Sequence, residues 1–401
     1  MKDSIPYNIQ RTKNATQAIF FICGLGISSW AVMVPFAKER LALNDASLGL
    51  LLLLLGAGAI AMMPVTGFLI HKFGSRIIIL IASIVTALTL PLLLLMSTSI
   101  SLGVVLFIFG AAIGTMDVAM NAHGVQVQNL YAKPIMSSLH GLFSTGGLLG
   151  SLGLGFLIKL GLSPVVSALS IAVSLLLIVG TQYGYLLKGS YEKELNDKSQ
   201  NENTSTETKG LATKWLKGSV IYLGIMCFIL FLSEGAMLDW SAVFLTENRG
   251  LDVTLAGLGY AAFSVAMAVM RLLGDKIVAK IEGKKVVIYG TLLAASGIFI
   301  AVTSPWIISS LVGFILLGIG AANVVPVFFS EAGRLKDVPA AVAIPAISTL
   351  GYAGQLAGPA LLGFIAHHAS LPLALGCTGC LLLLVGISYI FRKSPVSSKG
   401  D

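Results

Sequence analysis

Charged residues are scarce in this chain. Asp, Glu, Lys and Arg make up 11% of its 401 residues, whereas hydrophobic residues make up 56%. The mean hydropathy is +0.90. So few charges exclude an ordinary soluble globular domain, and they predict an all-α protein that crosses a membrane several times.

Patterns typical of enzymes are also lacking. We find no Ser-His-Asp arrangement, no metal-ligand spacing and no phosphate-binding loop placed to act. We therefore expect no enzymatic activity, no metal and no cofactor. The four cysteines all lie in apolar segments: Cys23, Cys227, Cys377 and Cys380. The C-x-x-C spacing of the last two is more typical of helix packing than of redox chemistry, and no disulfide framework is visible.

Apolar stretches near the ~20 residues that a membrane-spanning helix needs are abundant. The first follows a polar stretch without a cleavage site, so we expect it to be retained. The predicted spans are 16–37, 47–70, 77–96, 102–127, 136–159, 164–187, 218–245, 254–278, 285–302, 306–329, 340–366 and 371–391.

The distribution of basic residues predicts the orientation. With a cytoplasmic N-terminus, only Lys38, Arg40, Lys159 and Arg249 of the 26 Lys and Arg residues lie outside. The positive-inside rule therefore places both termini in the cytoplasm, with the protein in the inner membrane. The rule also explains the net charge of +8, so we expect membrane lipid and no nucleic acid among the partners.

Part of the sequence is repeated about 200 residues later. The pattern S-T-x-G-x-x-G at 144–150 returns at 348–354, and Trp30 and Asp117 correspond in order to Trp240 and Asn323. The repeat predicts two six-helix bundles, residues 1–187 and 218–401, with the substrate site where they meet. The polar stretch 188–217 is predicted to be a mobile cytoplasmic linker.

Several motifs resemble a known family. Residues 67–76, Gly-Phe-Leu-Ile-His-Lys-Phe-Gly-Ser-Arg, resemble the G-x-L-x-D-R-x-G-R-R signature of the major facilitator superfamily, with His71 at the aspartate position. Stretches 114–121, 139–144 and 234–241 are similar to the branch that contains fucose permease and YbjJ. The resemblance implies two pseudo-symmetric bundles of twelve helices in total, alternating access, and function as a monomer. Fucose permease has an aspartate in its first helix, whereas the first helix here has no acid before Glu39.

Asp117, Glu234 and Asp239 lie well inside predicted spans, where charge is unfavourable and each acid is a functional candidate. Asp117 and Asn121 share a helix face with Gly114, which leaves room for a ligand or a neighbouring helix. Burial disfavours a charged carboxylate, so Asp117 is a candidate for proton exchange. Glu234 is predicted to face the cavity, and Asp239 lies about 140° around the same helix, toward the outer mouth.

Other polar and aromatic residues complete the predicted site. Trp30 and Trp240 offer flat rings with one N–H donor each, for stacking on a ligand. Asn323 and Gln355 are further substrate-binding candidates, and His140 is expected to be a hydrogen-bonding partner near the inner end of its helix. The alternative for every residue of the site is a structural role.

A second group of charges is predicted at the inner ends of the helices. We expect Arg271 and Asp275, four residues apart, to form an inner gate with Glu331, Arg334, Lys336 and Asp337, while Asp239 contributes to an outer gate. Individual surface pairs of this kind are weak, and a solvated loop explains the same pattern.

We expect the cavity to hold acids and amides but no Lys or Arg. This favours a secondary active transporter of a small neutral polar solute, sugar-like by resemblance, coupled to protons. A drug–proton exporter of lipophilic cations is the first alternative. It is disfavoured because helix 136–159 has no Gly-Pro motif. A receptor or scaffold without transport is the second alternative, and buried acids have no evident purpose there.

Overall fold

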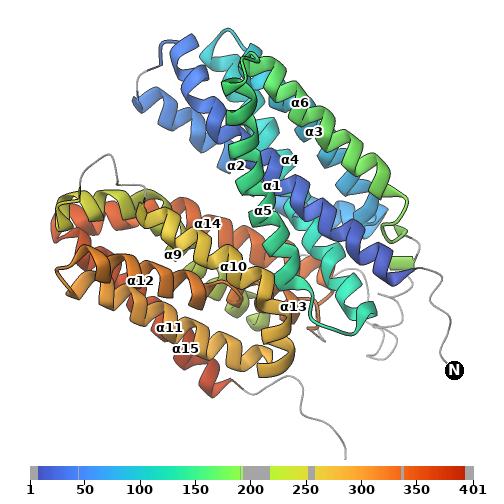
Figure 1. The fold of residues 1–401 in the computed structure, drawn as a ribbon. Helices are drawn as coiled ribbons and strands as arrows, with labels where there is room; N and C mark the ends of the chain where they lie inside the picture. Colours follow the sequence, from blue (N-terminus) through green and yellow to red (C-terminus); the bar gives the residue numbers. More distant parts are fainter. Residues whose placement is uncertain are drawn as a thin grey trace, which may run out of the picture. The chain divides into compact units, whose positions relative to one another are not determined.

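A computed structural model describes residues 8–43, 45–189, 191–192, 217–251, 258–335 and 338–392 (Figure 1). These residues form thirteen α-helices and no strand, as predicted for an all-α chain. Most of the predicted linker, and both Lys336 and Asp337, lie outside the described residues.

The chain divides into two compact units. Unit 1 is Met1–Ile221 with Phe329–Thr349, and unit 2 is Tyr222–Phe328 with Leu350–Asp401. Each unit therefore corresponds largely to one predicted bundle, while the segment Phe329–Thr349 clusters with the first. The units are described one at a time.

Six long helices make up most of unit 1, coloured blue to green in Figure 1. Three of these helices have a polar N-cap residue whose side chain accepts a hydrogen bond from a backbone N–H of the first turn. The caps are Asn8, Thr98 and Ser163. Such caps satisfy donors that have no partner inside the helix. The helices are α1 (Ile9–Arg40), α2 (Asp45–Phe73), α3 (Ser75–Leu95), α4 (Ser99–Tyr131), α5 (Met136–Lys159) and α6 (Pro164–Tyr183).

Unit 2 holds most of the helices of the second half, and three of them, α9, α13 and α14, also contribute residues to unit 1. They are α9 (Gly218–Arg249), α10 (Leu258–Ile281), α11 (Gly283–Thr303), α12 (Ile307–Ala321), α13 (Val324–Ala332), α14 (Ala340–His368) and α15 (Leu371–Phe391).

Each predicted span corresponds to a helix, except that α12 and α13 together form the tenth. The helix is interrupted at Ala322 and Asn323, four and three residues before Pro326. A proline has no N–H for the carbonyl four residues earlier, and its ring crowds that carbonyl, so a helix breaks there. Eleven segments of the described chain are long and apolar enough to cross a membrane; α10, which carries Arg271, Asp275, Lys276 and Lys280, is not among them.

Glycines bring paired helices into backbone contact at equivalent positions of the repeat. A Cβ added at Gly150 would overlap the carbonyl oxygen of Leu25 in α1, and one added at Gly354 would overlap that of Phe228 in α9. The last glycine of the repeated pattern therefore seats α5 on α1 in unit 1 and α14 on α9 in unit 2. Close approach through small residues is the main packing device of helices in lipid.

We expect Gly150→Ala and Gly354→Ala to lower the stability of the protein in detergent by about 1–3 kcal/mol, because the added methyl group overpacks a backbone contact. Thermal unfolding followed by fluorescence is the measurement. Gly153→Ala is the control, since a Cβ there meets nothing within 4 Å and alanine favours a helix. Equal effects of Gly150→Ala and Gly153→Ala would contradict this account of the repeat.

Candidate functional site

Asp117, Asn121 and His140 form a hydrogen-bonded chain inside unit 1. The Asn121 amide nitrogen donates to the Asp117 carboxylate Oδ1 at 3.2 Å and to the Asp117 backbone carbonyl at 2.9 Å. Its Oδ1 lies 3.1 Å from His140 Nε2. A backbone carbonyl only accepts, so the amide nitrogen of Asn121 must face it and the amide oxygen must face His140. His140 therefore carries its proton on Nε2 and donates it to Asn121.

This chain joins two helices in a buried setting. Asp117 and His140 are each 8% exposed, and Asn121 is fully buried. The imidazole packs edge-on against Phe20 of α1, with ring centroids 5.4 Å apart. The structure thus brings together the predicted pair Asp117–Asn121 and adds His140, which was expected only as a helix-end partner.

Gly114 serves the packing of α4 rather than a ligand. A Cβ there would lie 2.7 Å from Cα of Ala59 in α2. Of the two possibilities for this glycine, room for a neighbouring helix is confirmed. Thr115, the next residue, hydrogen-bonds across the same two helices to Thr66 at 3.2 Å.

Glu234 and Arg271 form an ion pair inside unit 2. Nη2 of Arg271 lies 3.1 Å from Oε1 of Glu234, and their side chains are 9% and 17% exposed. The expectation that the acids have no Lys or Arg beside them is therefore wrong. Arg271 was assigned to the inner end of its helix, yet it lies ten residues before the end of α10 at Ile281, which puts it about 15 Å from that end.

The interruption between α12 and α13 lies against this pair. Nε of Arg271 donates to the carbonyl of Ala322 at 3.2 Å, which is the carbonyl that Pro326 leaves without a helical donor. The amide nitrogen of Asn323 donates to the carbonyl of Met270 at 3.2 Å. The Asn323 Oδ1 is buried and has no hydrogen-bond partner among the described residues. Discontinuous helices often supply binding groups in transporters.

Three other predicted residues of unit 2 are placed on α9 and α14. Asp239 is exposed, whereas Glu234 is half-buried. This difference is consistent with the angle of about 140° expected between the two residues around α9. Trp240 packs against α14, where a Cβ at Gly363 would lie 3.1 Å from its ring. Gln355 is half-buried, and its backbone lies beside Gly235 of α9.

Both tryptophans of the repeat have buried indole nitrogens. Trp30 in unit 1 is 4% exposed, and Nε1 of Trp30 and of Trp240 has no hydrogen-bond partner among the described residues. Buried N–H groups normally have partners. These two N–H groups are therefore exceptions to that rule among the described residues.

The other residues of the predicted inner gate are only partly buried. Asp275 and Glu331 are half-buried, and Arg334 is exposed. Arg334 Nε donates to the side chain of Asn129 at 3.5 Å, within unit 1. Their role as a gate stays a prediction.

A buried polar cluster that we did not predict lies where α3 begins. Glu192 accepts hydrogen bonds from the Ser75 backbone N–H at 2.8 Å and from the Ser75 hydroxyl, and it lies 3.1 Å from Nδ1 of His123. The carboxylate thereby caps the N-terminus of α3, a favourable place for negative charge. Gly74 precedes it with φ of +84°, a conformation that suits glycine. The available signal was His123, an imidazole two residues after Asn121 in an apolar helix.

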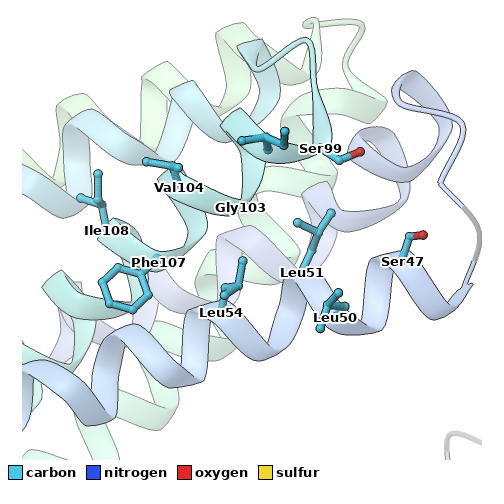
Figure 2. Close-up of a pocket in the computed structure, with 10 residues that line it drawn as sticks. Ser47, Leu50, Leu51, Leu54, Ser99, Gly103, Val104, Phe107 and Ile108 are labelled. Atoms are coloured by element: carbon cyan, nitrogen blue, oxygen red, sulfur yellow. The ribbon is translucent and has the colours of Figure 1, made fainter.

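An apolar groove lies between α2 and α4, away from these polar residues. Figure 2 shows the side chains of both helices that line it. Its volume is about 600 Å³, and Leu50, Ile100, Val104 and Phe107 are among its lining residues. It contains none of the predicted site residues.

We expect Asn121→Ala to destabilise the protein by about 1–3 kcal/mol, because the substitution leaves the buried Asp117 and His140 without their shared partner. Thermal unfolding in detergent measures this. Asn129→Ala, at an exposed position of the same helix, loses only the 3.5 Å hydrogen bond from Arg334 and should change stability by no more than about 0.5 kcal/mol. A loss no larger for Asn121→Ala than for Asn129→Ala would contradict the bridging role of Asn121.

Comparison with known proteins agrees with this architecture. A family model described as Major Facilitator Superfamily matches residues 18–336 and 242–401. An uncharacterised MFS-type transporter of Yersinia pestis is 45% identical over 374 residues, 93% of this chain and 94% of that protein. Membrane protein MosC of Rhizobium meliloti is 31% identical over 378 residues, 94% and 88% of the two chains.

Solved structures share the fold at low sequence identity. The Escherichia coli fucose:proton symporter FucP matches with a TM-score of 0.76 and 14% identity, over 95% of this chain and 98% of that chain. The proton:xylose symporter XylE matches with a TM-score of 0.74 and 15% identity, over 96% and 95%. The chain therefore belongs to the major facilitator superfamily and is a multi-pass membrane transporter.

Proposed function

We propose that this transporter is secondary active, and that it moves a small polar, sugar-like solute by alternating access, together with protons. The predicted preference for a neutral solute depended on the absence of a basic residue beside the acids. Arg271 removes that premise, so the proposal specifies polarity and size but not neutrality.

The observation that carries the proposal is a set of buried polar atoms without partners. Trp30 Nε1, Trp240 Nε1 and Asn323 Oδ1 have none among the described residues, and all three residues were predicted to bind the substrate. Leaving such groups unpaired is unfavourable by about 1–3 kcal/mol each. A solute that carries several hydroxyl groups offers both donors and acceptors to them, and indole rings suit the apolar faces of sugars.

Proton coupling is supported by the chain of Asp117, Asn121 and His140. Among the described residues, the Asn121 amide is the one side chain that hydrogen-bonds to the Asp117 carboxylate, and burial disfavours the charged form of that carboxylate. An acid in this setting is suited to gain and lose a proton during a transport cycle. The names of the structural neighbours point the same way, since FucP and XylE are symporters of fucose and xylose with protons.

The family also suggests how the cycle is organised. We propose that the two halves, residues 1–187 and 218–401, move against each other around Asp117, Asn121, Glu234, Asn323, Gln355 and the two tryptophans. Asp239 would act on the outer side, and Asp275, Glu331 and Arg334 on the inner side. By the positive-inside rule we place the monomer in the inner membrane with both termini cytoplasmic.

Proton movement in proteoliposomes tests the proposal. With a pH-sensitive dye inside, we expect a sugar or polyol from a panel of polar solutes to drive proton entry in wild type. Asp117→Asn should abolish that entry, because an amide cannot exchange a proton. Glu247→Gln is the control, because Glu247 is an exposed acid at the end of α9 and should leave proton entry unchanged.

Each other outcome has a distinct meaning. Solute uptake in wild type without proton movement would contradict coupling and leave a uniporter. Proton exchange driven only by lipophilic cations would favour a drug–proton antiporter. Transport of no solute in any panel would contradict the proposed class and favour a receptor.

A further inference from the structure

Arg271 is the only buried residue among the lysines and arginines whose exposure the structure describes, at 7% exposure. It lies thirteen residues after Leu258, the first residue of α10, and therefore about 20 Å along that helix. A charge at this depth is unfavourable and is usually found where it has a functional use.

The guanidinium group is held differently on its two sides. Nε donates to the Ala322 carbonyl at 3.2 Å, which needs a donor because Pro326 cannot supply one. Nη2 instead lies 3.1 Å from the Glu234 carboxylate. One side of Arg271 thus contacts a backbone carbonyl, while the other contacts the side chain of Glu234.

A guanidinium matches the geometry of a carboxylate and binds it through charge-assisted hydrogen bonds. In this structure the carboxylate beside Arg271 is that of Glu234. The Glu234 side chain is the more exposed of the pair, at 17% against 9% for Arg271. Beside the pair, Asn323 presents a buried Oδ1 that has no partner among the described residues. It is suited to accept a hydrogen bond from a hydroxyl group of a solute bound at Arg271.

We propose that Arg271 binds the carboxylate of a sugar-acid solute, which displaces Glu234 as the Glu234 carboxylate takes up a proton. The exchange conserves charge. Before it, the Glu234–Arg271 pair is neutral, and the solute anion and one proton are free. After it, Arg271 is paired with the solute carboxylate and Glu234 is a neutral acid. The inference depends on the proposed function, and it names the solute class and the residue that selects it.

Binding of matched acids and neutral analogues to the purified full-length protein tests this. The probes are glucuronate, galacturonate and gluconate, each compared with its amide and its parent sugar. We expect wild type to prefer at least one acid over its amide by about tenfold or more, as one charge-assisted hydrogen-bonded pair allows. That affinity should rise by about tenfold per unit fall in pH where one proton is taken up on binding.

Substitutions distinguish the role of Arg271 from that of Glu234. The double variant Arg271→Gln, Glu234→Gln removes both charges together, so no buried charge is left unpaired, and it should lose the preference for the acid. Glu234→Gln alone should still bind the acid, but it should lose the proton uptake at Glu234, so its affinity should depend less steeply on pH than that of wild type. Arg249→Gln is the matched control. Arg249 donates to the carbonyls of Ala301 and Val302, so the substitution should affect stability without altering the preference.

The failures are distinguishable. If wild type binds a neutral sugar with proton uptake but no acid, the proposal for Arg271 is overturned and the proposed function stands. The same holds if the acid is still preferred after both charges are removed. If neither acids nor neutral sugars bind or drive proton movement, both are overturned.

Discussion

The middle of unit 2 depends on the ion pair between Arg271 and Glu234. A lone guanidinium in hydrocarbon is unfavourable by about 2.5–3.5 kcal/mol on insertion scales. Removing one partner of a buried ion pair destabilises a protein strongly, because it leaves the other charge buried and unpaired. The pair ties α9 to α10, and the Nε hydrogen bond ties α10 to the interruption between α12 and α13. One chain of contacts therefore links Pro326, Arg271 and Glu234. Pro326 leaves the Ala322 carbonyl without a helical donor, Arg271 donates to that carbonyl, and Glu234 pairs with Arg271.

The two units differ in how their buried polar groups are paired, although a sequence repeat relates them. In unit 1 an aspartate, an asparagine and a histidine share hydrogen bonds. In unit 2 the position equivalent to Asp117 is Asn323, and the acid has moved to another helix and has gained an arginine. The repeat preserved the glycine contacts that seat α5 on α1 and α14 on α9, while the polar residues diverged. The two halves thus share these helix contacts and differ in the polar groups that they bury.

Much of the architecture could be predicted from the sequence because it depends on local patterns. Apolar runs set the spans, and the spacing of Asp117 and Asn121 on one helix face was enough to bring them together. Contacts between helices were harder to predict. Glu234 and Arg271 are 37 residues apart, and Asp275, four residues from Arg271, was an alternative partner for the arginine. The cluster of Ser75, His123 and Glu192 joins residues up to 117 positions apart, and periodicity carries no information about such pairings. Pro326 did contain the signal for the broken helix, and the carbonyl it leaves free explains one contact of Arg271.

The central claim is that a buried acid takes up a proton when the solute binds. The most direct measurement is the number of protons taken up per sugar acid bound, obtained by calorimetry on purified protein in buffers of different ionisation enthalpy. The account predicts about one proton per solute for wild type, by linkage between the two binding events. Binding of the acid with no proton uptake would contradict it.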